Sequence, residues 1–168
     1  MLTAIKAYFC AIMLKTKILL GLFLIVGVLT SCKKNSYDAD EQLKKDDALI
    51  LDFIAKNSIV AVKHSSGLYY QILNPGTGNE VTTSNTVTVN YQGKLLDGSE
   101  FDKSTSPVSF SLAGNLIQGW KIGVPLIKKG GKIRLIIPSV LAYGNESPGA
   151  GIPQNAVLDF TIDLINVQ

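Results

Sequence analysis

The second half of the chain carries short runs in which apolar and polar residues alternate, a pattern typical of strands with one buried face. The clearest run is Thr86–Gln92, where Val87, Val89 and Tyr91 fall on one face and polar residues on the other. Asp97-Gly98 follows shortly afterwards and is a strong hairpin-turn signal. Further strand-like runs lie at Ile59–Lys63, Leu68–Leu73, Val108–Leu112, Lys132–Pro138 and Val157–Val167. The pattern predicts an antiparallel sheet.

One segment before the sheet has helical spacing instead. Between Asp40 and Asn57, Leu43, Ile50 and Ile54 recur near helical spacing, and charged residues mark the opposite face. Asp38 or Asp40 could cap the start of this helix. The segment is either a spacer that packs on its own domain or an arm for dimerisation.

A second helical segment, Gln118–Lys129, contains residues that oppose a regular helix. Gly119 and Gly123 weaken it, and Pro125 in a helix interior should cost about 3 kcal/mol. We therefore expect a short or broken helix that is held by burial. Several short strands with one central helix predict an α+β domain of about 100 residues with one core.

The start of the chain has the pattern of a secretory signal. Two lysines precede the apolar run Ile18–Leu29, which is too short for a comfortable transmembrane helix. We interpret residues 1–31 as the signal peptide, and Met13 is an alternative start because the segment from there is already complete. Cys32 follows Leu-Thr-Ser, which resembles the lipobox of bacterial lipoproteins. That resemblance implies cleavage before Cys32 and acylation of it; the alternative is an uncleaved anchor with an incidental cysteine.

Processing of this kind would change the charge and the thiol content. The chain has 16 Lys+Arg and 13 Asp+Glu, but Lys6, Lys15 and Lys17 lie within the predicted signal. The mature chain would then have as many basic as acidic side chains, so its charge gives no reason to expect nucleic-acid binding. With Cys32 acylated, no thiol remains for a disulfide, a metal or a nucleophile. His64, the only histidine, has no carboxylate or cysteine partner nearby in sequence and is interpreted as a loop residue.

Aromatic residues provide the candidate chemistry. The only tryptophan, Trp120, follows Leu116 and Ile117, and a lone tryptophan beside aliphatic residues is usually core. Other aromatic residues stand beside turns or at strand ends: Tyr91, Phe101, Tyr143 and Phe160. Such a set is consistent with either a packed core or an apolar binding pocket.

Five blocks of sequence together distinguish these alternatives. They are Val87–Gly93 (VTVNYQG), Asp97–Asp102 (DGSEFD), Ile117–Trp120 (IQGW), Ala142–Gly144 (AYG) and Ile152–Pro153. In this order, within Gly67–Val167, they resemble the FKBP-type peptidyl-prolyl isomerases. The preceding lipobox and helix are similar to those of lipid-anchored members in Gram-negative bacteria. The resemblance implies a five-stranded antiparallel half-barrel wrapped around a short helix, with an N-terminal amphipathic helix before it.

The resemblance also implies a division of the chain and an apolar cleft between sheet and helix. Residues 32–40 would be the lipidated tether, 41–66 the N-terminal helix and connector, and 67–168 the isomerase domain. Trp120 would form the floor under the proline ring, and the sides would be formed by Tyr91, Phe101 and Phe160.

The remaining site residues implied by the resemblance are polar groups and rim residues. The Ile117 N–H and the Tyr143 hydroxyl would hydrogen-bond substrate carbonyls. Asp102 would either bond to Tyr91 or face the twisting amide. Substrate-binding residues around the pocket would be Leu116, Val108 and Ile152. Val108 stands where many members have an aromatic residue, which would leave the rim more open.

The implied activity is cis–trans isomerisation of X–Pro bonds in secreted or envelope proteins, with no cofactor and no metal. An FK506-type macrolide would be an inhibitor, and the lipid would hold the protein on a membrane in the cell envelope, at the outer membrane or facing the periplasm. Two other classes stay open. One is a proline-peptide-binding chaperone with little turnover, and the other is an accessory lipoprotein of a surface or motility apparatus.

Overall fold

The computed structural model describes residues 37–149 and 151–168. The predicted signal (1–31), the alternative start at Met13 and the lipidation site at Cys32 lie outside these residues. In the part of the chain that is described, no helix is both long and apolar enough to cross a membrane.

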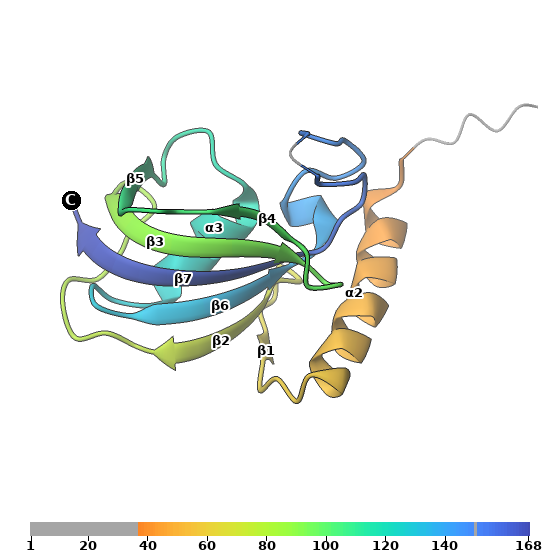
Figure 1. The fold of residues 1–168 in the computed structure, drawn as a ribbon, viewed down its shortest axis with the longest axis horizontal. Coiled ribbons are helices and arrows are strands. Elements are labelled where there is room, and N and C mark those ends of the chain that lie inside the picture. The colour runs from red at the N-terminus through yellow and green to blue at the C-terminus, as the bar shows by residue number, and fades with distance from the viewer. Residues whose placement is uncertain (1–36, 150) are drawn as a thin grey trace, which may run out of the picture. The chain divides into compact units, whose positions relative to one another are not determined.

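Within residues 37–149 and 151–168, seven strands form one antiparallel sheet (Figure 1). Their order is β1-β2-β6-β7-β3-β4, and β5 pairs with a different part of β3. The strands are β1 Val62–Lys63, β2 Tyr69–Asn74, β3 Thr86–Leu95, β4 Glu100–Lys103, β5 Val108–Ser111, β6 Lys132–Ile137 and β7 Leu158–Val167. The predicted α+β class is thereby confirmed.

The number of strands differs from the five that were expected. β4 pairs with Gln92–Lys94 and β5 pairs with Thr86–Val89, so the two behave as one strand interrupted between Lys103 and Val108. Pro107 lies in the interruption, and a proline has no N–H to donate to a ladder. The short edge strand β1 accounts for the remaining difference.

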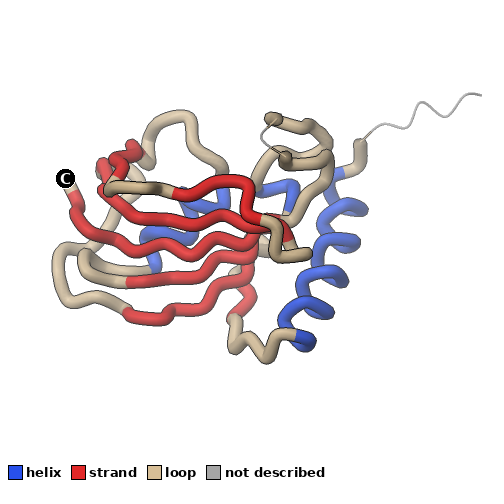
Figure 2. Tube along the Cα trace, viewed as in Figure 1, coloured by secondary structure: helices blue, strands red, loops and turns tan. Residues whose placement is uncertain are grey.

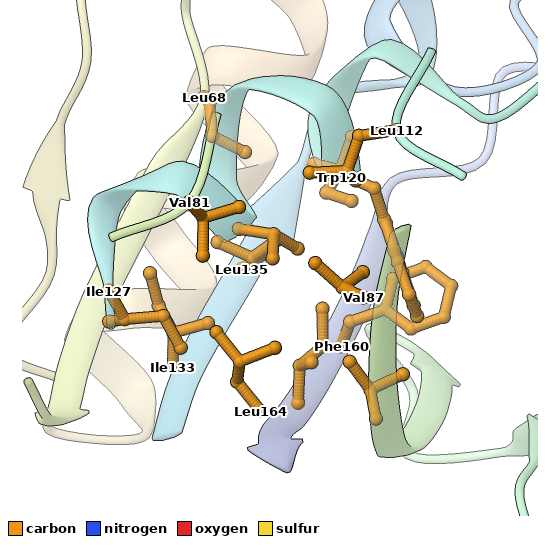
Figure 3. Close-up of a cluster of buried hydrophobic side chains, with 14 of the residues drawn as sticks. Leu68, Val81, Val87, Leu112, Trp120, Ile127, Ile133, Leu135, Phe160 and Leu164 are labelled. Atoms are coloured by element: carbon orange, nitrogen blue, oxygen red, sulfur yellow. The ribbon is translucent and has the colours of Figure 1, made fainter. Parts of the chain in front are cut away.

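The main core lies between the sheet and the helix α3, Gln118–Gly123 (Figure 3). The 3-10 turn η1, Val124–Leu126, continues directly from α3, so the expected broken helix is present with Pro125 at its break. The helix approaches β6 closely because it presents glycines to the strand. A Cβ on Gly119 would overlap Ile137, and one on Gly123 would overlap Leu135.

The helix α2, Ala39–Lys56, lies across one end of the sheet, beside the start of β2 and the end of β6 (Figure 2). Asp38 caps this helix by accepting hydrogen bonds from the N–H groups of Asp40 and Glu41. Ile50 is fully buried in a second apolar cluster that includes Tyr69 and Ile136. The helix therefore packs on its own domain, as the spacer alternative requires.

Candidate active site

A cavity of about 500 Å³ opens beside α3, and residues far apart in sequence line it. Its lining residues are Tyr91, Asp102, Phe110, Asn115, Leu116, Ile117, Gln118, Trp120, Ala142, Tyr143 and Phe160. They come from strands β3, β4, β5 and β7, from the start of α3 with the turn before it, and from the loop after β6. Seven of the expected site residues are thus brought together: Tyr91, Asp102, Leu116, Ile117, Trp120, Tyr143 and Phe160.

Trp120 lies at the base of this cavity with only 3% of its surface exposed. Three rings meet it edge-on, with centroid distances of 5.4 Å to Tyr91, 5.3 Å to Phe110 and 5.4 Å to Phe160. Edge-to-face contacts of this kind favour a fixed ring orientation. Trp120 therefore contributes an apolar surface to the cavity.

The indole N–H of Trp120 is buried and has no hydrogen-bond partner among the described residues. A buried tryptophan in an ordinary core usually pairs this group, because an unmet donor costs free energy.

Glycine at position 93 provides the space for two of the surrounding rings. On β3, Gly93 is paired with Phe160 of β7, and a Cβ there would overlap both Phe160 and Phe101. Those two rings contact each other at a centroid distance of 5.4 Å. A β-strand glycine often marks such a close approach.

Tyr91 and Asp102 form the polar edge of the cavity. The Tyr91 hydroxyl donates a hydrogen bond to Asp102 Oδ2 at 2.7 Å, which is the first of the two arrangements expected for Asp102. Burial, the bond to Asp102 and the charge of that carboxylate raise the pKa of Tyr91 to about 12. The phenol therefore stays protonated near neutral pH.

Tyr143 reaches the cavity from the loop that follows β6, and 39% of its surface is exposed. Burial, and then the charge of Asp102, raise the pKa of Tyr143 above the ordinary tyrosine value. Its hydroxyl is therefore a neutral donor near physiological pH.

Ile117 and Leu116 contribute to the wall at the start of α3. The Ile117 carbonyl accepts a hydrogen bond from the backbone N–H of Trp120 at 3.1 Å. No hydrogen bond between backbone groups of the described residues uses the Ile117 N–H as a donor. One backbone donor is therefore available beside the apolar floor.

Three expected residues lie outside the cavity wall. Phe101 packs on Phe160, and Ile152 is 5% exposed within the main core. Val108 is paired with Val89 at the outer part of β5 and is 37% exposed, so the structure does not place it at the pocket rim. Phe110, two residues further along the same face of β5, lines the cavity instead.

The sequence pattern was not used to place Phe110 in the site, although the alternation of the strand could have identified it. Val108 and Phe110 occupy alternate positions of a strand, so both had to point to the same face. Asn115, Gln118 and Ala142 were also missed as lining residues, because polar or small side chains near a turn carry no apolar pattern.

The described part of the chain contains no residue grouping that is typical of a metal site. Among residues 37–149 and 151–168, no cluster of three or more His, Cys, Asp or Glu side chains could hold an ion. His64 bonds with Ser66 in the turn between β1 and β2.

Comparison with known proteins gives concordant matches. Residues 78–165 match the sequence profile described as FKBP-type peptidyl-prolyl cis-trans isomerase. The FKBP-type peptidyl-prolyl cis-trans isomerase FkpA of Escherichia coli (strain K12) is 49% identical over 107 residues, which are 62% of this chain and 39% of that protein. A probable FkpA of Neisseria meningitidis serogroup B is 38% identical over 138 residues, 80% of this chain and 50% of that protein. The chain thus spans half or less of the length of these two curated relatives.

Solved structures agree with the sequence matches. The crystal structure of FkpA from Escherichia coli superposes with a TM-score of 0.67 at 40% identity, covering 77% of this chain and 62% of that one. A peptidyl-prolyl cis-trans isomerase from Pseudomonas syringae pv. tomato also gives a TM-score of 0.67, at 34% identity, and covers 80% of this chain and 98% of that one.

Proposed function

The chain belongs to the FKBP-type peptidyl-prolyl cis-trans isomerase family, and on that premise we propose that it catalyses cis–trans isomerisation of X–Pro bonds in polypeptide substrates. The observation that carries the proposal is the cavity floored by Trp120 and walled by aromatic rings, with neutral hydrogen-bond donors at its edge.

The reaction requires no covalent chemistry from the protein. Rotation about an X–Pro bond crosses a barrier of about 18–20 kcal/mol that arises from amide resonance. The twisted amide has lost that resonance and is less dipolar than either planar form. An apolar cavity that excludes water favours it, and each 1.4 kcal/mol of preference for the twisted form gives about a tenfold rate increase.

Each group around the cavity then has a role in this proposal. Trp120 supports the proline ring, and Tyr91 and Phe160 wall its sides, joined by Phe110. The Ile117 N–H and the Tyr143 hydroxyl donate to substrate carbonyls. Asp102 is held at the edge by its bond from Tyr91.

We also propose an extracytoplasmic location with a lipid anchor. The sequence pattern of residues 1–31 and the Leu-Thr-Ser-Cys motif ending at Cys32 support it. Residues 32–40 would then be the tether, 41–66 the helix and connector, and 67–168 the isomerase domain. The substrates would be X–Pro segments of secreted or envelope proteins. Labelling with radioactive palmitate should give a membrane-bound product that Cys32→Ala abolishes; equal labelling of both forms would contradict the proposed anchor.

An FK506-type macrolide is the proposed inhibitor, because a ring of aromatic side chains over an apolar floor suits a bulky apolar ligand. Binding should quench the fluorescence of Trp120, the only tryptophan of the chain. Unchanged fluorescence and undiminished catalysis at saturating macrolide would exclude this ligand.

The test of the activity uses residues 33–168 and a peptide with one X–Pro bond. Trp120→Ala should lower kcat/KM roughly a hundredfold because the proline ring loses its support. Tyr143→Phe should lower it about three- to tenfold because one hydrogen bond to the substrate is lost. Tyr70→Phe is the matched control, since it also deletes a phenol hydroxyl but Tyr70 packs on the core away from the cavity lining.

A folded wild-type protein with no rate above background would refute the enzymatic proposal. Peptide binding without turnover would then support the chaperone alternative, and titration of Trp120 fluorescence with the same peptide would measure it.

A further inference from the structure

A buried carboxylate joins α2 to the loop that carries Tyr143. Asp46 of α2 is fully buried, and aspartate is almost never fully buried unless it is paired. Its Oδ2 accepts hydrogen bonds from the backbone N–H of Ser139 at 2.7 Å and from the Ser139 hydroxyl at 2.6 Å. Its Oδ1 accepts from the Gln42 side-chain amide at 2.7 Å. Both oxygens of the carboxylate are therefore used.

Ser139 links Asp46 to the backbone on both sides of Tyr143. It is the first residue of the 3-10 turn η2, Ser139–Leu141, and it is fully buried itself. Its carbonyl accepts hydrogen bonds from the N–H groups of Ala142 at 2.9 Å and Gly144 at 2.8 Å. Those are the residues on either side of Tyr143, so one buried serine, fixed by Asp46, holds the backbone on both sides of the phenol.

Tyr37, which precedes α2, lies near the same loop. Gly144 has a positive φ of +60°, and a Cβ there would lie 3.5 Å from the hydroxyl oxygen of Tyr37. The Gly144 carbonyl accepts a hydrogen bond from the Asn155 N–H at 2.8 Å, which ties the two ends of the loop together. The loop is therefore held to α2 through Ser139 and closed by the hydrogen bond between Asn155 and Gly144.

We propose that Asp46 is a positioning residue for catalysis, and that α2 is part of the isomerase site because it fixes the loop bearing Tyr143. This inference rests on the proposed function. Asp46 acts only through Ser139 and touches no substrate. Displacement of a catalytic group by about 1 Å is enough to cost up to a hundredfold in rate, so a loop held by two hydrogen bonds to one carboxylate is sensitive to that carboxylate.

Asp47, the residue next to Asp46, distinguishes positioning of the Tyr143 loop from attachment of α2 alone. Asp47 accepts a hydrogen bond from the Tyr69 hydroxyl at 2.6 Å and pairs with Lys63. It therefore attaches α2 to β1 and β2 and makes no hydrogen bond to the Tyr143 loop. Loss of Asp47 therefore weakens the attachment of α2 and leaves the hydrogen bonds between Asp46 and Ser139 in place.

The experiment compares Asp46→Ala, Asp46→Asn and Asp47→Ala in the full-length chain, purified in detergent, with an X–Pro peptide as substrate. Asp46→Ala leaves both Ser139 donors without an acceptor and should lower kcat/KM about tenfold. Asp46→Asn keeps an oxygen that can accept both bonds, and the Gln42 amide can rotate to pair with the new amide, so this variant should restore most of the rate. Asp47→Ala should keep the wild-type rate at a temperature where all variants are folded.

Two further readouts respond to positioning and not to general stability. In a Tyr143→Phe background, Asp46→Ala should cause little additional loss of rate, because residues that act through one group are non-additive. Amide hydrogen exchange at Ala142 and Gly144 should be faster in Asp46→Ala and unchanged in Asp47→Ala.

The outcomes distinguish this inference from the proposed function. The role of Asp46 alone would be overturned if the wild type were active and Asp46→Ala behaved like Asp47→Ala. It would also be overturned if the losses of rate from Asp46→Ala and Tyr143→Phe simply added. An inactive wild type would overturn the proposed function, and the inference with it.

Discussion

The proposed role of Tyr143, a hydrogen bond to a substrate carbonyl, requires that its hydroxyl is protonated. Its pKa lies above the ordinary tyrosine value because burial and the Asp102 charge disfavour the tyrosinate. The donating form is therefore complete below that ordinary value and is lost only as the pH rises beyond it. We expect kcat/KM to be flat from about pH 7 to about pH 9.5 and to fall above about pH 10.

A protease-free NMR exchange assay measures this profile, and circular dichroism monitors the fold at each pH. Tyr143→Phe should show a lower plateau with no fall just above pH 10, since the pKa of Tyr91 is raised to about 12. A fall in the wild-type rate between about pH 7 and pH 9 would show that another group controls the reaction.

At the scale of elements, the close packing of the short helix α3 on β6 depends on glycines, which have no side chain on the face toward the strand. Glycine to alanine in a helix interior ordinarily stabilises by about 1 kcal/mol. At Gly119 the new Cβ would overlap Ile137 on β6, and overpacking of a core costs about 1–3 kcal/mol. We therefore expect Gly119→Ala to lower the free energy of unfolding, as measured with urea, and to weaken the proposed macrolide binding because Trp120 is the next residue.

Lys121→Ala on the same helix is the control for this prediction. It shortens a half-buried side chain that is not part of either apolar cluster, and it should change the free energy of unfolding by less than about 0.5 kcal/mol. A stabilised Gly119→Ala protein would mean that α3 can move away from β6 without cost.

At the scale of the whole domain, α3 packs on one face of the sheet and α2 is attached beside the start of β2 and the end of β6. The attachment of α2 should depend on pH. Hydrogen bonds from Lys63 and Tyr69 lower the pKa of Asp47. A carboxylate whose pKa is lowered by folding stabilises the fold above its unfolded pKa of about 3.9, and this stabilisation is lost as the pH falls through the folded value.

Asp47→Asn should therefore reduce stability at neutral pH, and the difference from the wild type should shrink as the pH falls below about 3.9 and vanish once Asp47 is protonated in the folded protein. Urea unfolding of both proteins across that range measures it. Asp52→Asn provides the matched control, because the exposed Asp52 pairs only with Lys56 on the same helix and such pairs contribute little. A difference between wild type and Asp47→Asn that persists in acid would have to come from packing.

Much of this molecule could be predicted from local pattern. Alternation identified two of the sheet strands to within one residue, β6 at Lys132–Ile137 and β7 at Leu158–Val167. Glycine and proline predicted that the segment after Ile117 would break, as it does at Val124. These features depend on backbone dihedrals and on the side to which neighbouring side chains point, so a short window of sequence determines them.

Other features depend on how distant segments meet, and only the tertiary structure decided them. The pairing of β4 and β5 with separate parts of β3 set the number of strands, and it put Phe110 in the cavity where Val108 was expected. The contact between Asp46 and Ser139 joins residues 93 positions apart. In the sequence Asp46 is one of several charged residues on a helix, and its burial arises only when α2 packs against the loop after β6. Local periodicity specified the elements by itself, whereas register and packing, which sum many weak long-range contacts, specified the site.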